Sequence, residues 1–231
     1  GRRLRPIVAQ PSRGAWNRCM HSVCYVSGVA DGAAVERIYH AGRASETVLD
    51  RRSPYRIGYL ERRSDGPWHS IAEPLALHGP DRPSVLEPKV EFHDGRWHMR
   101  FLTVPAGRPG SEDPSMFRIM HTTSANGRDD WTTPVEWFGV DDGFYDSVVV
   151  HDERRALMVI TRDSDLEGRE HNPPQGVWLS RADTPVAPRA AWSPPVRVFA
   201  AEDAGYEWTA NGMCAPSAAW GDPEHRTLSV F

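Results

Sequence analysis

Residues 87–102 read EPKVEFHDGRWHMRFL, and this stretch carries the clearest indication of the fold in the chain. In its second half, apolar side chains alternate with His98 and Arg100, which is the period of two that a half-buried strand shows. The pair Asp94-Gly95 separates this strand from the apolar segment before it, and Asp-Gly between two such runs favours a tight hairpin. The stretch therefore predicts two adjacent antiparallel strands.

The same order of elements recurs along the chain. Units with a short apolar opening segment begin near residues 21, 87, 146 and 215, a period of roughly 60–70 residues that is typical of propeller blades. A tryptophan opens the last expected strand of three units, at Trp68, Trp131 and Trp192, where we expect a packing role. The pattern predicts an all-β chain, a β-propeller of four-stranded antiparallel blades, with residues 1–231 forming one domain.

Each complete unit should contain four strands, and no helix is expected. The expected strands are 21–25, 36–40, 55–60 and 71–77, then 89–92, 96–102, 116–121 and 135–138, then 146–150, 156–161, 176–180 and 196–199, then 213–220 and 227–231. At this period, 231 residues supply about 3.6 units. A propeller closes to hide its strand edges, and the sequence leaves open how this one does so.

Composition excludes several classes of function. The mean hydropathy is −0.54 and no apolar run approaches the length of a membrane span, so we expect no membrane partner. The net charge of −4 argues against a nucleic-acid surface. Three cysteines without a Cys-x-x-Cys pair indicate buried free thiols, which favours the cytoplasm, although a mature secreted protein stays open.

The opening positions of the units are the candidate chemical site. A propeller brings the start of each innermost strand to one central pocket, and the residues at those starts are His21, Glu87, Asp146 and Ala215. Glu87 and Asp146 are carboxylates that can act as acid and base, and His21 titrates near neutrality. We therefore expect Glu87, Asp146 and His21 to be the catalytic residues.

Three long connections, residues 41–53, 103–115 and 162–175, should lie on the same face as the pocket and carry charged side chains. A solvated charged rim is the alternative interpretation of these loops. Candidate substrate-binding residues are the possible anion clamps and the aromatic side chains that could stack on a sugar ring: Arg43, Arg162, His171, Tyr145 and Trp208. No metal ligand set with short local spacing is present, and we expect neither a metal nor another cofactor.

The pattern resembles the five-bladed propeller glycosidases, which include arabinanases, β-xylosidases and, more distantly, invertases and levansucrases. The resemblance rests on units that open with an acidic residue followed by Pro or Ser, on the Gly-turn and aromatic-x-Met strand at 94–99, and on the Ser-x-Gly-x-Trp hairpin at 64–68. It covers about residues 16–231 and implies five blades. It also implies three blade-opening carboxylates: a base or nucleophile, a positioning group that tunes pKa, and a general acid.

The positions that match those carboxylates are His21, Glu87 and Asp146, so the first is not a carboxylate here. A glycosidase acting on a sugar or sugar-like small molecule remains the first expectation, with Glu87 and Asp146 as the acid–base pair and His21 assisting. Two alternatives stay open. One is a lyase, isomerase or cyclase of small-molecule biosynthesis, since fold does not fix reaction. The other is a non-catalytic carbohydrate-binding propeller. The oligomeric state is not predicted.

Overall fold

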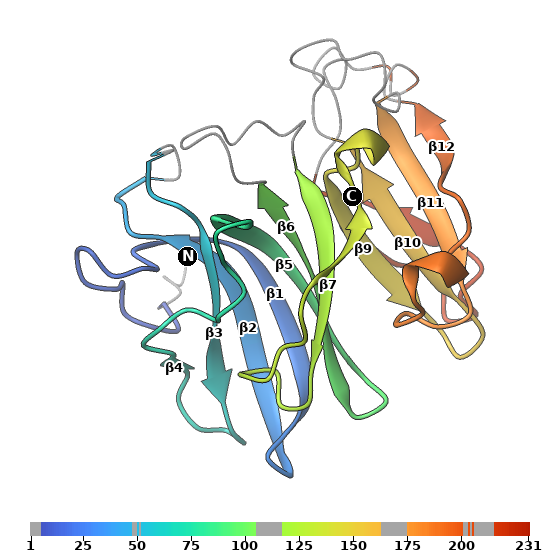
Figure 1. Ribbon diagram of the computed structural model, residues 1–231. Helices are drawn as coiled ribbons and strands as arrows, with labels where there is room; N and C mark the ends of the chain where they lie inside the picture. The colour runs from blue at the N-terminus through green and yellow to red at the C-terminus, as the bar shows by residue number, and fades with distance from the viewer. Residues whose placement is uncertain are drawn as a thin grey trace. The chain divides into compact units, whose positions relative to one another are not determined.

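A computed structural model of the chain describes residues 6–47, 50, 52–104, 117–162, 175–200, 203, 205 and 215–231. Its strands and two short 3₁₀ turns follow one another along the chain (Figure 1). In order they are β1 (Cys19–Ala30), β2 (Ala33–Arg43), β3 (Arg56–Arg62), β4 (His69–Ser70), β5 (Ser84–His93), β6 (Arg96–Val104), β7 (Arg118–Ser124), β8 (Val135–Phe138), η2 (Val140–Asp142), β9 (Asp146–His151), β10 (Ala156–Thr161), β11 (Gly176–Ala182), η3 (Arg189–Ala191), β12 (Val196–Ala200), β13 (Ala218–Trp220) and β14 (Leu228–Val230).

Among these residues the strands form three four-stranded sheets and one two-stranded sheet. The orders are β1-β2-β3-β4, β5-β6-β7-β8, β12-β11-β10-β9 and β13-β14, so each complete sheet is a meander of neighbours in sequence. The pairings β1–β2, β2–β3, β3–β4, β5–β6, β9–β10, β10–β11, β11–β12 and β13–β14 are all antiparallel. The predicted all-β class and the four-stranded antiparallel repeat are therefore confirmed.

The hairpin that decides the fold forms as its sequence predicts. His93 of β5 pairs with Arg96 of β6, and the two residues between them, Asp94 and Gly95, have φ of 49° and 74°. Two left-handed residues in a two-residue loop match the twist of the flanking strands, and glycine accepts this conformation without a steric penalty. The first hairpin, between β1 and β2, turns in the same way.

The predicted strand 71–77 is wrong in its bounds. The fourth strand of the first sheet, β4, contains only His69 and Ser70, directly after Trp68. Pro74 lies inside the predicted segment and has no N–H to give to a strand ladder. The segment still follows β3 irregularly, because the N–H groups of Ile71 and Leu75 donate to backbone carbonyls of that strand.

The contacts divide the chain into two compact parts, which we describe separately. The first part contains Gly1–Glu112 and Met120–Val135, and the second contains Asp113–Ile119 and Glu136–Phe231. The core of the first part lies where β5 packs against β1 and β2, and it contains Tyr39, Trp97 and Phe101, all nearly inaccessible to solvent. Gly28 of β1 belongs to this core because a Cβ there would lie 2.7 Å from the Trp97 ring.

A buried arginine holds this core together. Arg37 of β2 is fully buried, and its guanidinium donates to Glu61 Oε2 through Nε at 2.9 Å and Nη2 at 2.7 Å. Its Nη1 donates to the Tyr39 hydroxyl and to the carbonyl of Asn126 at 2.6 Å. The same guanidinium stacks 4.5 Å from the Tyr59 ring centroid and 4.7 Å from that of Trp97. These contacts pair the charge with a carboxylate and hold the planar group against two aromatic rings.

The second part has its own aromatic contacts. Phe144, just before β9, packs edge-to-face on Trp178 of β11 at 5.6 Å and on Phe138 of β8 at 5.2 Å. Trp220 of β13 donates from its indole N–H to the carbonyl of His151 at 3.0 Å, which ties the two-stranded sheet to β9. Trp192, one of the three repeat tryptophans, is buried as predicted.

Three histidines of the first part should make the fold sensitive to acid. Burial lowers the pKa of His40 to about 4; burial, helped by Arg100, lowers that of His98 to about 4 and that of His121 to about 3. The rings of His98 and His121 also stack, with centroids 5.7 Å apart. Because the unfolded chain binds protons near pH 6.5 and the folded chain does not, stability rises with pH between about 4 and 6.5.

We therefore expect the free energy of unfolding to fall as the pH is lowered from 7 to 5. Near pH 5, unfolding should take up nearly one proton for each of these buried histidines. Urea unfolding at pH 7, 6 and 5 measures this slope. His121→Gln should reduce the slope, whereas His69→Gln, at an exposed position, should leave it unchanged. A stability that does not vary over this range would contradict the prediction.

Candidate functional site

Two β-bulges face each other in the first part. In β1, Ser22 and Val23 lie between the paired residues His21 and Cys24, so two residues oppose one residue of β2. In β5, Glu87 and its neighbour Pro88 form the same irregularity. Ser22 and Glu87 both adopt left-handed φ, of 54° and 52°. This conformation costs a non-glycine residue about 1 kcal/mol. A bulge changes the direction in which a side chain points.

The bulges correct one detail of the predicted repeat. They make Ser22 the counterpart of Glu87, so the predicted equivalence of His21 with Glu87 is displaced by one residue. Neither position is the first of its strand, because β1 begins at Cys19 and β5 at Ser84. Ala215, in the fourth repeat, has the same φ of 54°, whereas Asp146 pairs with Thr161 in a ladder of regular register.

His21, Ser22 and Glu87 form one hydrogen-bonded cluster. The Ser22 hydroxyl donates to Glu87 Oε1 at 2.5 Å and lies 2.5 Å from His21 Nδ1. The distance from His21 Nδ1 to Glu87 Oε1 is 3.8 Å, so the hydroxyl bridges a pair that does not bond directly. Sequence reasoning found His21 and Glu87 and missed Ser22. Alignment of the two units on their Asp-Gly turns could not have found Ser22. More paired residues separate the bulge from the turn in β1 than in β5.

The surroundings of His21 oppose its protonation. Burial lowers the pKa of His21, the Glu87 carboxylate raises it, and the Arg43 guanidinium lowers it, with a net decrease. The His21 ring meets Tyr55 edge-on with centroids 4.6 Å apart. Its Nε2 is shielded from solvent and has no hydrogen-bond partner among the described residues. His21 is therefore held as a neutral imidazole beside a carboxylate, an arrangement suited to proton transfer.

Arg43, a predicted substrate-binding residue, lies at the end of β2 in the same region. Its side chain is fully buried, its guanidinium lies 3.5 Å from the Tyr55 ring centroid, and Nη1 donates to the carbonyl of Asp50 at 2.8 Å. The stacking on Tyr55 places a cation and an aromatic ring beside His21. These contacts join Arg43 to Tyr55 and to Asp50, and a role in binding substrate stays a prediction.

The second part holds three of the other predicted residues at one end of its four-stranded sheet. Asp146 opens β9, is 2% exposed and accepts the backbone N–H of Ser147 at 2.7 Å. It pairs across the ladder with Thr161, next to Arg162, whose side chain is also buried. Tyr145 precedes Asp146 and packs on Phe117 at 5.0 Å. Asp146, Arg162 and Tyr145 therefore lie at one end of this sheet, and their catalytic or binding roles stay predictions.

The remaining predicted residues, His171 and Trp208, lie outside the described residues, as does most of the loops 103–115 and 162–175. Cys19 and Cys24 are free and half-buried, and Cys214 is outside the described residues. In the described part of the chain, no three His, Cys, Asp or Glu side chains gather in a way that could hold a metal ion. No described helix is long and apolar enough to cross a bilayer.

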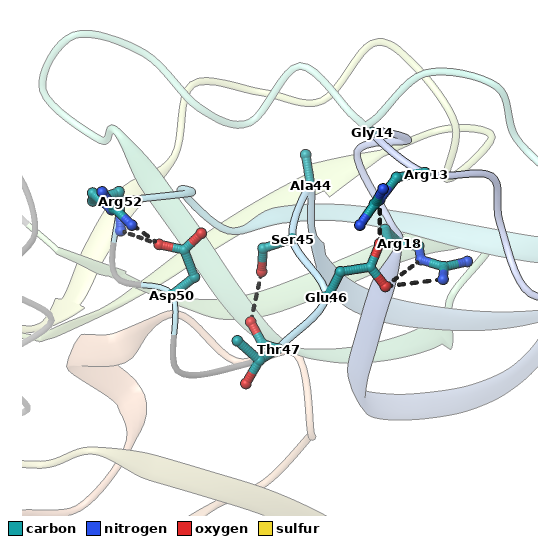
Figure 2. A pocket seen from close by; sticks show the side chains of 9 residues that line it. All are labelled: Arg13, Gly14, Arg18, Ala44, Ser45, Glu46, Thr47, Asp50 and Arg52. Atoms are coloured by element: carbon teal, nitrogen blue, oxygen red, sulfur yellow. Dashed lines mark hydrogen bonds and ion pairs between the residues drawn. The ribbon is translucent and has the colours of Figure 1, made fainter.

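An open groove of about 820 Å³ lies elsewhere in the first part (Figure 2). Two of its arginines, Arg13 and Arg18, pair with Glu46 at 3.4 and 2.9 Å, and Arg52 pairs with Asp50 at 3.6 Å. Each of these cations therefore has a carboxylate partner within the groove itself. For this reason we place the candidate site at the bulges and not in the groove.

Comparison with known proteins supports the fold. No protein-family model and no curated protein matches the sequence. Among solved structures, the catalytic domain of the Coprinopsis cinerea GH62 α-L-arabinofuranosidase aligns with a TM-score of 0.51 and 13% identity, over 84% of this chain and 54% of that one.

Two further structures align equally well. A GH43 arabinoxylan arabinofuranohydrolase from Bacillus subtilis has a TM-score of 0.51 and 16% identity, over 75% of this chain and 36% of its own. A family 117 glycoside hydrolase from Zobellia galactanivorans has a TM-score of 0.51 and 14% identity, over 76% and 55%. The chain thus spans about half the length, or less, of these structures. At such identities the similarity concerns the fold alone: the chain has the β-propeller fold of these glycoside hydrolases.

Proposed function

We propose that the protein is a glycosidase-like enzyme that acts on a sugar or a sugar-like small molecule by acid–base chemistry. The observation that carries the proposal is the cluster at the facing bulges, where a carboxylate and a neutral histidine share one serine hydroxyl. Residues held in strained backbone, as Ser22 and Glu87 are, cluster at functional sites. The propeller fold supports the carbohydrate class, because its solved relatives named above are glycoside hydrolases.

In the proposed mechanism, Glu87 and Asp146 are the acid–base pair and His21 assists. Glycoside hydrolysis needs one group to protonate the leaving oxygen and a second to activate water or to attack the anomeric carbon. Glu87 keeps Oε2 for a substrate, since Oε1 accepts the Ser22 hydroxyl. His21, joined to Glu87 through the Ser22 hydroxyl, can accept a proton from the substrate or return one.

The finer features of the prediction belong to this proposal as well. We propose that Arg43, Arg162, His171, Tyr145 and Trp208 contact the substrate, and that the ring has five blades. The three four-stranded sheets and the two-stranded sheet support a repeating blade without fixing the number. The proposed partner is a carbohydrate or another small molecule, and no cofactor takes part in the proposed chemistry.

One observation favours the second candidate, a non-glycosidase enzyme such as a lyase, isomerase or cyclase. Ser22 occupies the bulge position equivalent to Glu87, so only one of the two facing bulges provides a carboxylate. A site with one carboxylate and a neutral histidine also suits proton abstraction and return on a substrate that is not hydrolysed.

A substrate screen tests the first candidate against the second. The purified protein is incubated with aryl and natural arabinosides, xylosides, galactosides and glucosides, and the released sugar is measured with Glu87→Gln protein as the blank. We expect hydrolysis of at least one pentoside or hexoside by the wild-type protein only. Failure across the panel together with conversion of a non-sugar metabolite supports the second candidate. Sugar binding measured by calorimetry, without turnover of any substrate, would contradict both enzyme candidates and indicate a non-catalytic carbohydrate-binding propeller.

A further inference from the structure

The Ser22 hydroxyl has only one proton, and its two neighbours decide where that proton lies. The hydroxyl donates to Glu87 Oε1 at 2.5 Å, and an ionised carboxylate can only accept. The contact of 2.5 Å between Ser22 Oγ and His21 Nδ1 must then take its proton from the imidazole. Neutral His21 is therefore the Nδ1–H tautomer, and its Nε2 carries the lone pair.

This order of groups differs from that of a serine nucleophile. In a Ser-His-acid triad the histidine lies between the serine and the carboxylate and takes the serine proton. Here the serine lies between the histidine and the carboxylate, and its proton is directed to Glu87. The hydroxyl oxygen accepts a hydrogen bond from the His21 ring and its proton is bonded to the Glu87 carboxylate, so His21 is not positioned to deprotonate it for attack. Ser22 is thus arranged to orient its neighbours.

We propose that Ser22 is the positioning residue of this site: its hydroxyl fixes His21 as the Nδ1–H tautomer and holds one oxygen of Glu87. The bulge supports this role, because the left-handed backbone at Ser22 and Glu87 turns both side chains toward the same point. The consequence is that Nε2 is the basic nitrogen of His21 and Oε2 is the reactive oxygen of Glu87. The functional part of this inference rests on the proposed function, and the tautomer does not.

The tautomer is measured by NMR on ¹⁵N-histidine-labelled protein, above the pH at which His21 titrates. The correlation pattern of each imidazole shows which nitrogen carries the proton, and His21→Gln identifies the His21 signals among the ten histidines. We expect Nδ1–H in the wild-type protein and a shift toward Nε2–H in Ser22→Gly. Glycine removes the hydroxyl and accepts the left-handed backbone, so this variant should fold.

Two further variants complete the test. Ser22→Ala removes the hydroxyl at a different backbone cost, and it should give the same tautomer shift as Ser22→Gly. Ser27→Ala makes the same chemical change at an exposed position of the same strand, and it should leave the His21 signals unchanged. An Nε2–H tautomer in the wild-type protein, or a wild-type pattern in both Ser22 variants, overturns the proposal.

Once a substrate is known, kinetics separate this inference from the proposed function. Loss of an orienting partner should lower kcat about 10- to 100-fold in Ser22→Gly, with KM changed less than about twofold. The expected tautomers without any glycoside turnover would refute the proposed function alone. Glycoside turnover with kcat unchanged in Ser22→Gly would refute the positioning role alone.

Discussion

Glu87→Gln lowers kcat about a thousandfold on the substrate that the screen identifies, because removal of a general acid or base costs about 10²- to 10⁴-fold. The amide keeps the size of the side chain and can still accept the Ser22 hydroxyl through its carbonyl oxygen. It cannot exchange a proton with a leaving group or with water. The effect should therefore appear in kcat at nearly unchanged KM, measured by steady-state kinetics over a range of pH.

Glu73→Gln is the matched control, since it makes the same change at an exposed position of the first part, and it should retain wild-type turnover. Asp146→Asn should lower kcat to a similar extent if Asp146 is the second member of the pair. Full turnover in both Glu87→Gln and Asp146→Asn would refute the acid–base assignment. Loss in Glu87→Gln alone would keep Glu87 and His21 and remove Asp146 from the mechanism.

Arg37→Ala should destabilise the fold by about 3–5 kcal/mol, the cost of breaking a buried ion pair. The change removes both hydrogen bonds to Glu61 Oε2 and both aromatic stacking contacts. It also leaves the Tyr39 hydroxyl and the Asn126 carbonyl without the donor that Arg37 supplies. Urea unfolding followed by tryptophan fluorescence should show a lower midpoint, or an unfolded protein if the loss exceeds the total stability.

Arg63→Ala provides the comparison, because Arg63 donates to the other oxygen of the same carboxylate at 3.1 Å. Its side chain is 49% exposed, and an exposed pair contributes about 1 kcal/mol or less. Each variant thus removes one of the two arginines that bond to Glu61, and the two arginines differ in how deeply their side chains are buried. Similar losses of stability in both would show that the buried network around Arg37 does not stabilise the core as described.

Local sequence patterns predicted much of the strand order. The strands at 135–138 and 156–161 have the predicted bounds, and the Asp94-Gly95 hairpin lies where expected. These elements depend on the alternation of apolar side chains and on glycine conformation, both of which are local. The strand predicted at 71–77 failed because Pro74 interrupts the ladder and because Trp16, distant in sequence, donates to the carbonyl of Ala72.

The chemical site was predictable in part for the same reason. Repetition along the chain identified Glu87 and Asp146 as candidates at equivalent places in two units, and a single sequence contains that information. The contact between Ser22 and Glu87 joins residues that are 65 positions apart and depends on a bulge in each strand. No residue type in the sequence marks either bulge. The paired segment between bulge and turn is longer in β1 than in β5, so alignment of the repeats matches His21 with Glu87, although Ser22 is the structural equivalent.

The all-β class and the repeating unit follow from the sequence alone, because strand periodicity and turn chemistry act over a few residues. Only the tertiary structure decided that a serine hydroxyl joins His21 to Glu87 and that Arg37 is enclosed by two aromatic rings. Such contacts form when separate sheets pack face to face, and the hydrogen bonds then depend on register and bulge geometry that no local pattern encodes.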